Sequence, residues 1–323
     1  MKTKLSAATL TVSLALLAYS QAALAQQRTA TLTQTGAHNS AAIEQENARI
    51  STQAVITQTG NDNIAGGAAV EVGIVQRASR GAATITQDGN RNLAGILQEL
   101  TTTHATATVS QAGDDNLVLI SQVSNFSPAA TAAQSGTRNT IYISQTNVDN
   151  LAETRQTGAD NVITLDQHGA AYGGPVITQD GIGNTLALRQ YTDSYTGGIT
   201  LSQTGMRNNA DVTRSSSALG EGMSIIQNGS DNQVAYTGNG GRSPTVVNQN
   251  GDANTATVTK NLSYNGSTIL QTGNLNTATV TQSGVAASGL QPLNVATIIQ
   301  VGNGFTASIA QAGSGNVGTI YQH

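Results

Sequence analysis

The chain has 323 residues, a formal net charge of −4, no cysteine, and only 10% charged and 3% aromatic residues. Ordinary globular domains carry about a quarter charged residues, so this composition excludes a conventional multilayer core. The mild acidity argues against nucleic acid and an anionic membrane surface as partners. Two classes of protein remain, a disordered low-complexity chain and a repeat fold with a thin core.

The first residues have the pattern of a secretory signal. Lys2 and Lys4 are followed by an apolar run at residues 10–18 and by a small-x-small cleavage site that ends at Ala25. The apolar run is too short to span a bilayer. We therefore predict a signal peptide at residues 1–25 and a secreted repeat domain at residues 26–323.

The mature chain is dominated by one motif, Q-x-G-x-x-N, which occurs twelve times, mostly 22 to 24 residues apart. Such strict spacing is not needed by a disordered chain, so it favours a repeat fold. Degenerate copies begin at Gln282 and Gln300. The intact copies begin at Gln34, Gln58, Gln87, Gln111, Gln134, Gln156, Gln179, Gln203, Gln227, Gln249, Gln271 and Gln311.

Apolar and polar residues alternate on both sides of the motif. Ala83, Ile85 and Gln87 share one face before the turn, and Ile141 and Ile143 share one face after it. Period-two alternation predicts strands with one buried face, and the Gly and Asn of G-x-x-N predict a tight turn between them. Each repeat is then one coil of an all-β solenoid with two strands per coil and roughly twelve coils, stacked about 4.8 Å apart.

The inward face contains many amides, which are costly to bury alone. Stacking each amide on its copy in the next coil converts this cost into a cooperative ladder, so we predict an amyloid-competent cross-β core. Its predicted residues are the twelve motif glutamines above, the apolar pair Ala41 and Ile43, the glycines Gly36, Gly60, Gly89, Gly113, Gly136, Gly158, Gly181, Gly205, Gly229, Gly251, Gly273 and Gly313, the asparagines Asn39, Asn63, Asn92, Asn116, Asn139, Asn161, Asn184, Asn208, Asn232, Asn254, Asn276 and Asn316, and the glutamines that close each repeat, Gln45, Gln98, Gln122, Gln145, Gln167, Gln190, Gln282 and Gln322.

The closing glutamine is replaced in four copies, by Ala69, Arg214, Gly238 and Lys260. We interpret these replacements as faults in the ladder on the outer turn, which a long stack tolerates. The alternative is a patch that slows premature aggregation.

The repeat pattern extends from residue 30 to Gln322 and shows no capping helix. Solenoids that stay soluble protect their terminal coils, because an open coil is an edge strand. We therefore expect both ends to present unpaired backbone and unfilled amide ladders, which end-to-end stacking of copies would satisfy.

These residues resemble the repeat of the curlin family, the subunits of curli amyloid fibres on bacterial surfaces. Gln34, Gly36, Asn39, Ala41 and Gln45 match the last five fixed positions of the family pattern S-x5-Q-x-G-x2-N-x-A-x3-Q. The resemblance implies an extracellular homopolymer that functions in adhesion and biofilm, as main subunit or nucleator. It also implies a companion curlin subunit and export through a dedicated outer-membrane pore with accessory chaperones.

Other functions find little support in the sequence. A monomeric ice- or carbohydrate-binding solenoid is the alternative, because Thr31-Leu32-Thr33 and Thr84-Ile85-Thr86 are paired threonines of the kind that ice binding uses. We expect no enzymatic activity, no cofactor and no metal site, since the four histidines share no spacing. We interpret the turn arginines Arg91, Arg138 and Arg207 as charges that discourage sideways aggregation.

Overall fold

The computed structural model describes residues 10–13, 28–46, 52–66, 73–77, 80–100, 104–124, 127–147, 151–169, 174–192, 198–216, 222–239, 241, 243–261, 264–284 and 294–323. Most of the predicted signal peptide, including the cleavage site at Ala25, lies outside these residues. The chain divides into two compact units, residues 1–147 and 148–323.

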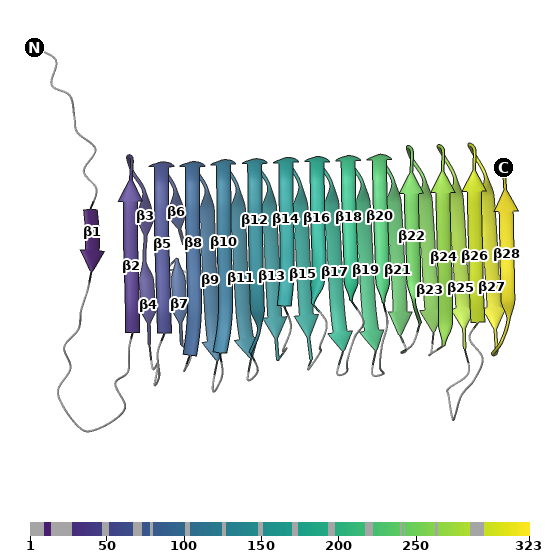
Figure 1. Ribbon diagram of the computed structural model, residues 1–323, viewed down its shortest axis with the longest axis horizontal. Helices are drawn as coiled ribbons and strands as arrows, with labels where there is room; N and C mark the ends of the chain where they lie inside the picture. Colours follow the sequence, from purple (N-terminus) through teal and green to yellow (C-terminus); the bar gives the residue numbers. More distant parts are fainter. Residues whose placement is uncertain are drawn as a thin grey trace, which may run out of the picture. The chain divides into compact units, whose positions relative to one another are not determined.

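Unit 1 contains five coils, each with a first strand before the motif turn and a second strand after it (Figure 1). The first strands pair with one another in parallel, and so do the second strands. The first strands are β2 (Arg28–Thr35), β5 (Thr52–Asn61), β8 (Arg80–Asn90), β10 (His104–Asp114) and β12 (Ala129–Thr137). The second strands are β3 (Ser40–Ala41) with β4 (Ile43–Gln45), β6 (Ile64–Ala65) with β7 (Ile74–Gln76), β9 (Leu93–Leu100), β11 (Leu117–Ser124) and β13 (Thr140–Thr146).

Unit 2 repeats this plan in seven coils and ends on one further strand. Its first strands are β14 (Leu151–Ala159), β16 (Pro175–Ile182), β18 (Ile199–Met206), β20 (Met223–Ser230), β22 (Thr245–Asn250), β24 (Asn265–Thr272), β26 (Asn294–Val301) and β28 (Val317–Gln322). Its second strands are β15 (Val162–His168), β17 (Thr185–Thr192), β19 (Asn209–Ser216), β21 (Gln233–Asn239), β23 (Thr255–Asn261), β25 (Thr277–Ser283) and β27 (Thr306–Ala312).

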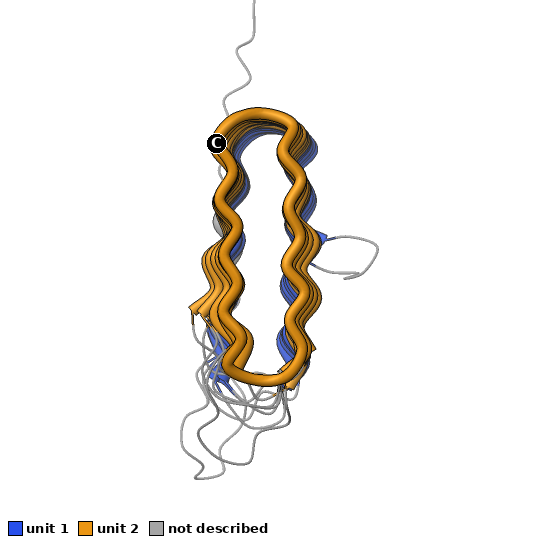
Figure 2. Tube along the Cα trace, turned by 90° about the vertical axis from the view of Figure 1, so that its right-hand side faces the viewer, with its two compact units in different colours: residues 1–147 blue, residues 148–323 orange. Residues whose placement is uncertain are grey.

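The coils of each unit form a flattened ring in which the two rows of strands face each other (Figure 2). Alternate residues point into the narrow space between them, so Val109 and Ile120 are fully buried while Ser110 is exposed. The predicted β-solenoid with period-two strands and two strands per coil is confirmed. No helix long and apolar enough to cross a membrane occurs in the part of the chain that the structure describes.

The motif glycines have a conformation and a neighbour that exclude other residues. Gly89 has a φ of +122°, and a Cβ atom built on it would overlap the backbone carbonyl group of Gly113 in the next coil. Glycine thus permits both the turn and the close approach of successive turns. The residue before each motif Asn also has positive φ, as at Arg91 (54°) and Asp115 (59°).

The N-terminal coil differs from the predicted open end. β1 (Leu10–Ser13) pairs with β2 in antiparallel orientation, with Leu10 opposite Gln34 and Ser13 opposite Thr31. The predicted open edge is that of the mature chain, and in the full-length chain β1 covers it. Because β1 lies within the predicted signal peptide, cleavage after Ala25 would remove it and expose the edge of β2.

Candidate self-assembly core

The motif glutamines form a column, here called the opening column, along the first strands of each unit. In unit 1 the Nε2 of each glutamine donates to the Oε1 of the glutamine in the following coil, at 2.6 to 3.0 Å from Gln34 to Gln134. In unit 2 the same bonds measure 2.7 to 3.0 Å from Gln156 to Gln322. Each column therefore has one direction, with every amide donating toward the C-terminal end.

Each glutamine uses its second N–H on the opposite strand. Gln111 Nε2 donates to Gln134 Oε1 at 3.0 Å and to the Leu93 carbonyl at 3.1 Å, while Gln111 Oε1 accepts from Gln87 at 2.9 Å. All amide hydrogens of this fully buried side chain are bonded, so the desolvation cost of an unpaired amide is avoided. The bond to Leu93 also joins the two facing rows of strands.

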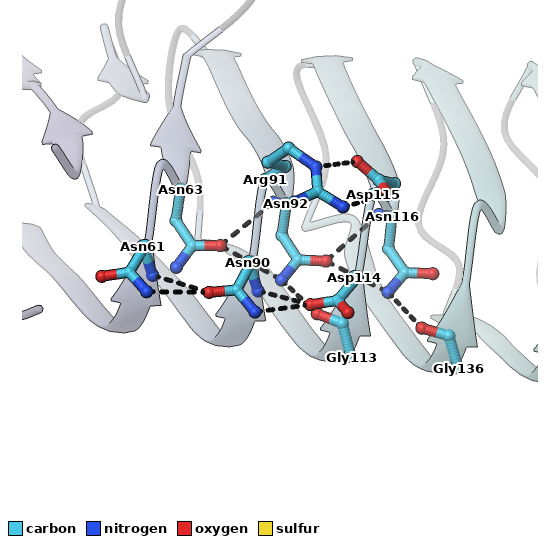
Figure 3. Close-up of polar contacts among 10 residues, drawn as sticks. All are labelled: Asn61, Asn63, Asn90, Arg91, Asn92, Gly113, Asp114, Asp115, Asn116 and Gly136. Carbon is cyan, nitrogen blue, oxygen red and sulfur yellow. Dashed lines mark hydrogen bonds and ion pairs between the residues drawn. The ribbon is translucent and has the colours of Figure 1, made fainter. Parts of the chain in front are cut away.

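The motif asparagines form a second column at the turn, with the opposite direction (Figure 3). Asn92 Nδ2 donates backward to Asn63 Oδ1 at 3.1 Å and forward to the Gly113 carbonyl at 2.7 Å. The Oδ1 of Asn92 accepts from the backbone N–H and the Nδ2 of Asn116, both at 3.1 Å. The motif Gly and Asn thus act as one unit that locks each turn to its neighbours.

A third column lies outside the asparagine column, two residues earlier in each turn, and was not predicted from the sequence. Asn61 donates from its backbone N–H and its Nδ2 to Asn90 Oδ1, and Asn90 donates in the same way to Asp114 Oδ1 at 2.9 Å (Figure 3). In unit 2, Asp252 Oδ1 accepts from the backbone N–H of Ser230, and the backbone N–H of Asp252 donates to Asn274 Oδ1, both at 2.8 Å. The frequent Asn and Asp within the turns are the sequence signal for this column.

Two turn arginines form ion pairs along the stack. Arg91 donates to both carboxylate oxygens of Asp115 at 2.7 Å, and Arg207 contacts both oxygens of Asp231 at 2.7 to 2.8 Å. The hydrogen bond from Arg91 lowers the pKa of the Asp115 carboxyl below its ordinary value. These arginines therefore join consecutive coils in addition to charging the surface.

The closing glutamines form a column of their own along the second strands. In unit 1 their bonds measure 2.8 to 2.9 Å from Gln45 to Gln145. The predicted replacement of this glutamine by Ala69 is wrong, and Ala69 lies outside the described residues. Gln76 holds the position, paired with Gln45 and with Gln98, because the second strand of this coil is interrupted between β6 and β7.

Residues 82–123 match the family described as the curlin-associated repeat. This segment carries the curlin-associated repeat. The matched segment extends from β8 to β11 and includes two consecutive rungs of the opening column, Gln87 and Gln111. The predicted resemblance is confirmed for this segment, and no curated protein matches the chain.

Unit 2 contains buried cations in the closing column, where faults on the outer turn were predicted. Arg214 and Lys260 are 0% and 2% exposed and lie in register with the closing glutamines, so the predicted placement on the outer turn is wrong. At Gly238 between them, the Tyr236 hydroxyl occupies the space that a Cβ atom would need. Arg214, Lys260 and Tyr236 thus fill the closing column at the three positions that lack glutamine.

Lys260 has its own set of acceptors. Its Nζ donates to the Ser243 carbonyl at 3.0 Å, the Pro244 carbonyl at 2.7 Å and the Thr245 hydroxyl at 2.7 Å. Three acceptors satisfy the three donors of an ammonium group. The next amide in the column, Gln282, keeps its Oε1 buried without a hydrogen bond, because an ammonium bonded elsewhere does not donate to it.

Two predicted motif starts lie in the other row of strands. Gln311 was expected to precede a first turn, and Gln282 was expected both to start a degenerate motif and to close a repeat. Both lie in second strands, β25 and β27, at closing positions, where Gln282 donates to Gln311 at 2.8 Å. Gln322, predicted as a closing glutamine, lies instead on the first strand β28 in the opening column. Gln300 does belong to the opening column, in register with Gln271. Both strands of a coil can end in glutamine, so local sequence does not separate an opening from a closing position.

Proposed function

We propose that the protein is a structural subunit of an extracellular, curli-type amyloid fibre that grows by end-to-end stacking of β-solenoids. The observation that carries the proposal is the single direction of the amide columns. When every glutamine donates to the next coil, the first glutamine of the column has an unused acceptor oxygen and the last has an unused N–H donor. The two ends are therefore complementary to each other, and copies can add head to tail without limit.

The terminal rungs are built for such addition. Gln34 Oε1 accepts no hydrogen bond from any described residue, whereas its Nε2 donates to Gln58. At the other end, the Nε2 of Gln322 donates to the Thr306 carbonyl at 3.2 Å and to no further glutamine among the described residues. Ile309 and Gln311 are 7% and 9% exposed, although their counterparts in the preceding coil, Val280 and Gln282, are 0% and 1%. Stacking would bury this apolar surface and fill both ladders.

The strand β1 would delay polymerisation until the signal peptide is removed. While Leu10–Ser13 covers β2, a second chain cannot pair with that edge. Signal cleavage would remove this cover during export, so polymerisation would begin only in the secreted chain.

The same proposal includes the biological setting of the curlin repeat. We propose secretion through the periplasm and a dedicated outer-membrane pore with accessory chaperones, a companion curlin subunit, and a role in adhesion and biofilm. The proposed role is structural, without catalysis and without a cofactor.

A monomeric ice-binding solenoid would need a regular outward array of threonines. Only partial arrays occur in the described strands. In unit 1, Thr84, Thr108 and Thr131 are consecutive in register but Val55 interrupts the row, and the row of Thr33, Thr57 and Thr86 continues to Ser110. In unit 2, a row of four threonines from Thr213 to Thr281 is bounded by Arg189 and Ala310. These interruptions and the complementary ends favour the fibre.

Incubation of purified residues 26–323 with thioflavin T tests the proposal. We expect fibres with a meridional reflection at about 4.7 Å and faster growth when preformed fibres are added as seeds. A chain that remained folded, monomeric and thioflavin-negative for days would refute the proposed function.

A further inference from the structure

The last intact motif copy, residues 311–316, lies at the opposite end of the coil from the other intact copies that the structure describes. Those copies connect a first strand to the following second strand. Residues 311–316 connect the second strand β27 to the first strand β28. At the end of unit 2 the motif is therefore shifted by half a coil, from the turn after a first strand to the turn after a second strand.

The last coils have an asparagine ladder at this other turn, here called the second turn. Asn294 Nδ2 donates to Asn265 Oδ1 at 2.9 Å and to the Gly313 carbonyl at 2.7 Å, and the Asn316 backbone N–H donates to Asn294 Oδ1 at 3.0 Å. These are the bonds that Asn63, Asn92 and Gly113 make at the first turn. The second turn has thus acquired the first-turn architecture and ends on an asparagine.

The first-turn ladder, in contrast, is closed by Phe305. Phe305 stands where the motif has Asn, and its backbone N–H donates to Asn276 Oδ1 at 3.0 Å. Its ring lies over Gly302, where a Cβ atom would be 2.7 Å from Cε2 of the ring. At Gly273, one coil earlier, the same space is filled by the carbonyl group of the glycine in the next coil. The ring therefore occupies the place that a further glycine would take.

The second turn remains open at the corresponding point. A Cβ atom on Gly313 would meet only Asn316 Nδ2, at 3.8 Å, among the described residues. One terminal turn is blocked by a ring and the other offers a free glycine site and a terminal asparagine. The structure thus indicates which turn can receive another coil.

The N-terminal segment has the sequence that this surface requires. Residues 30–39 and 307–316 share the pattern A-x-[LI]-x-Q-x-G-x-x-N, and each is followed by a glutamine six residues after its asparagine, at Gln45 and Gln322. When the two segments are aligned on this pattern, the inward residue Leu32 lies beside Ile309. Apolar side chains then lie beside apolar side chains, and amides beside amides, throughout the segment.

We propose that a second copy of this chain docks with its β2 beside β27 and its β3–β4 beside β28. The first strand of one copy then continues the row of second strands of the other, and the two rows exchange at every junction of the fibre. Gln311 Nε2 donates to the Val295 carbonyl at 2.9 Å and to the Asn316 carbonyl at 3.1 Å, and on docking the second of these bonds would be exchanged for one to Gln34. Asn316 Oδ1 would accept from Asn39, and Gln322 would donate to Gln45. This inference rests on the proposed function and specifies how its subunits join.

The simpler junction, with β2 beside β28, is disfavoured by two features. It would place first strand on first strand, so β27, which pairs with β25 on one side, would have no neighbouring strand on its outer side and its seven residues would keep an unpaired edge there. It would also bring the first turn of the new copy to the side that Phe305 blocks. Exchange of the rows pairs the outer side of β27 with β2 and keeps the first turn of the new copy away from the side that Phe305 blocks.

Cysteine cross-linking in assembled fibres distinguishes the two junctions, because the chain contains no native cysteine. Directly paired strands are about 4.8 Å apart, within the range that a disulfide spans. In the proposed register the outward residue Thr33 lies beside Ala310, and in the simpler junction it lies beside Tyr321. The test compares Thr33→Cys/Ala310→Cys with the matched control Thr33→Cys/Tyr321→Cys, after oxidation of fibres and denaturing electrophoresis without reductant.

We expect a ladder of covalent dimers, trimers and larger species from Thr33→Cys/Ala310→Cys, at least five-fold stronger than from the control. A second pair, Glu44→Cys/Tyr321→Cys, should also give a ladder, since Glu44 would lie beside Tyr321. Fibres that cross-link only through Thr33→Cys/Tyr321→Cys would overturn the exchange of rows and leave the proposed fibre function intact. Failure of the unsubstituted chain to form fibres would overturn both.

Discussion

Replacement of Gln111 by leucine tests whether the opening column stabilises the coil. The substitution keeps the side-chain volume but removes the bonds to Gln87 and Gln134 at 2.9 and 3.0 Å and the bond to the Leu93 carbonyl at 3.1 Å. It leaves one N–H of Gln87 and the Oε1 of Gln134 buried without partners. At roughly 1–3 kcal/mol for each unsatisfied buried group, we expect a loss of about 2–6 kcal/mol.

A double substitution provides a sharper test of the ladder. In Gln87→Leu/Gln111→Leu the orphaned groups are the N–H of Gln58 and the Oε1 of Gln134, which is again two amide groups. Only one more backbone carbonyl, that of Ile64, loses a donor. We therefore expect the double substitution to cost much less than twice the single one.

The assay is guanidinium unfolding followed by circular dichroism, with Ser110→Ala as the control. Ser110 is the exposed neighbour of Gln111 on the same strand, and a surface substitution of this kind shifts stability by less than about 0.5 kcal/mol. An unchanged midpoint for Gln111→Leu, or a doubled loss in the double variant, would refute the argument that the amides stabilise the fold by stacking.

Three further predictions concern the turn, the closing column and the surface charges. Gly89→Ala should destabilise the fold by at least about 1–3 kcal/mol, because Gly89 has a φ of +122° and an added Cβ would overlap the next turn. The control Gly222→Ala should change the stability little, since no atom lies within 4 Å of the added Cβ. Equal effects of the two substitutions in thermal melts would contradict this prediction. Lys260→Gln should be more stable than Lys260→Met by about 1–3 kcal/mol, because only the amide can donate to the unbonded oxygen of the next closing glutamine; chemical unfolding of both variants measures the difference. Because its arginine partner lowers the pKa of Asp115, the stabilisation by this ion pair is complete above the unfolded pKa near 3.9 and disappears as the pH falls through the lower folded pKa. The difference in unfolding midpoint between wild type and Asp115→Asn should therefore vanish in strong acid. A difference that grew in strong acid would exclude the ion pair as its source.

The repeat made much of the fold predictable from local sequence. The alternation before Gln87 and after Asn139 predicts strands, because a period of two leaves one face to bury. The glycine in each turn predicts a positive φ, and Gly89 shows the reason in its contact with the next turn. The outer column through Asn90 and the pairing of Arg91 with Asp115 were missed, since both depend on residues one coil apart.

The sequence by itself determined the elements of this protein, namely the strands, the first turns and the amides that must stack. The tertiary structure decided which strand lies beside which. It placed Gln76 in the closing column, buried Lys260 among three carbonyl and hydroxyl oxygens, and assigned Gln311 to a second strand. The physical reason is that both strands of a coil have the same local pattern, so only hydrogen bonding between coils distinguishes one row from the other.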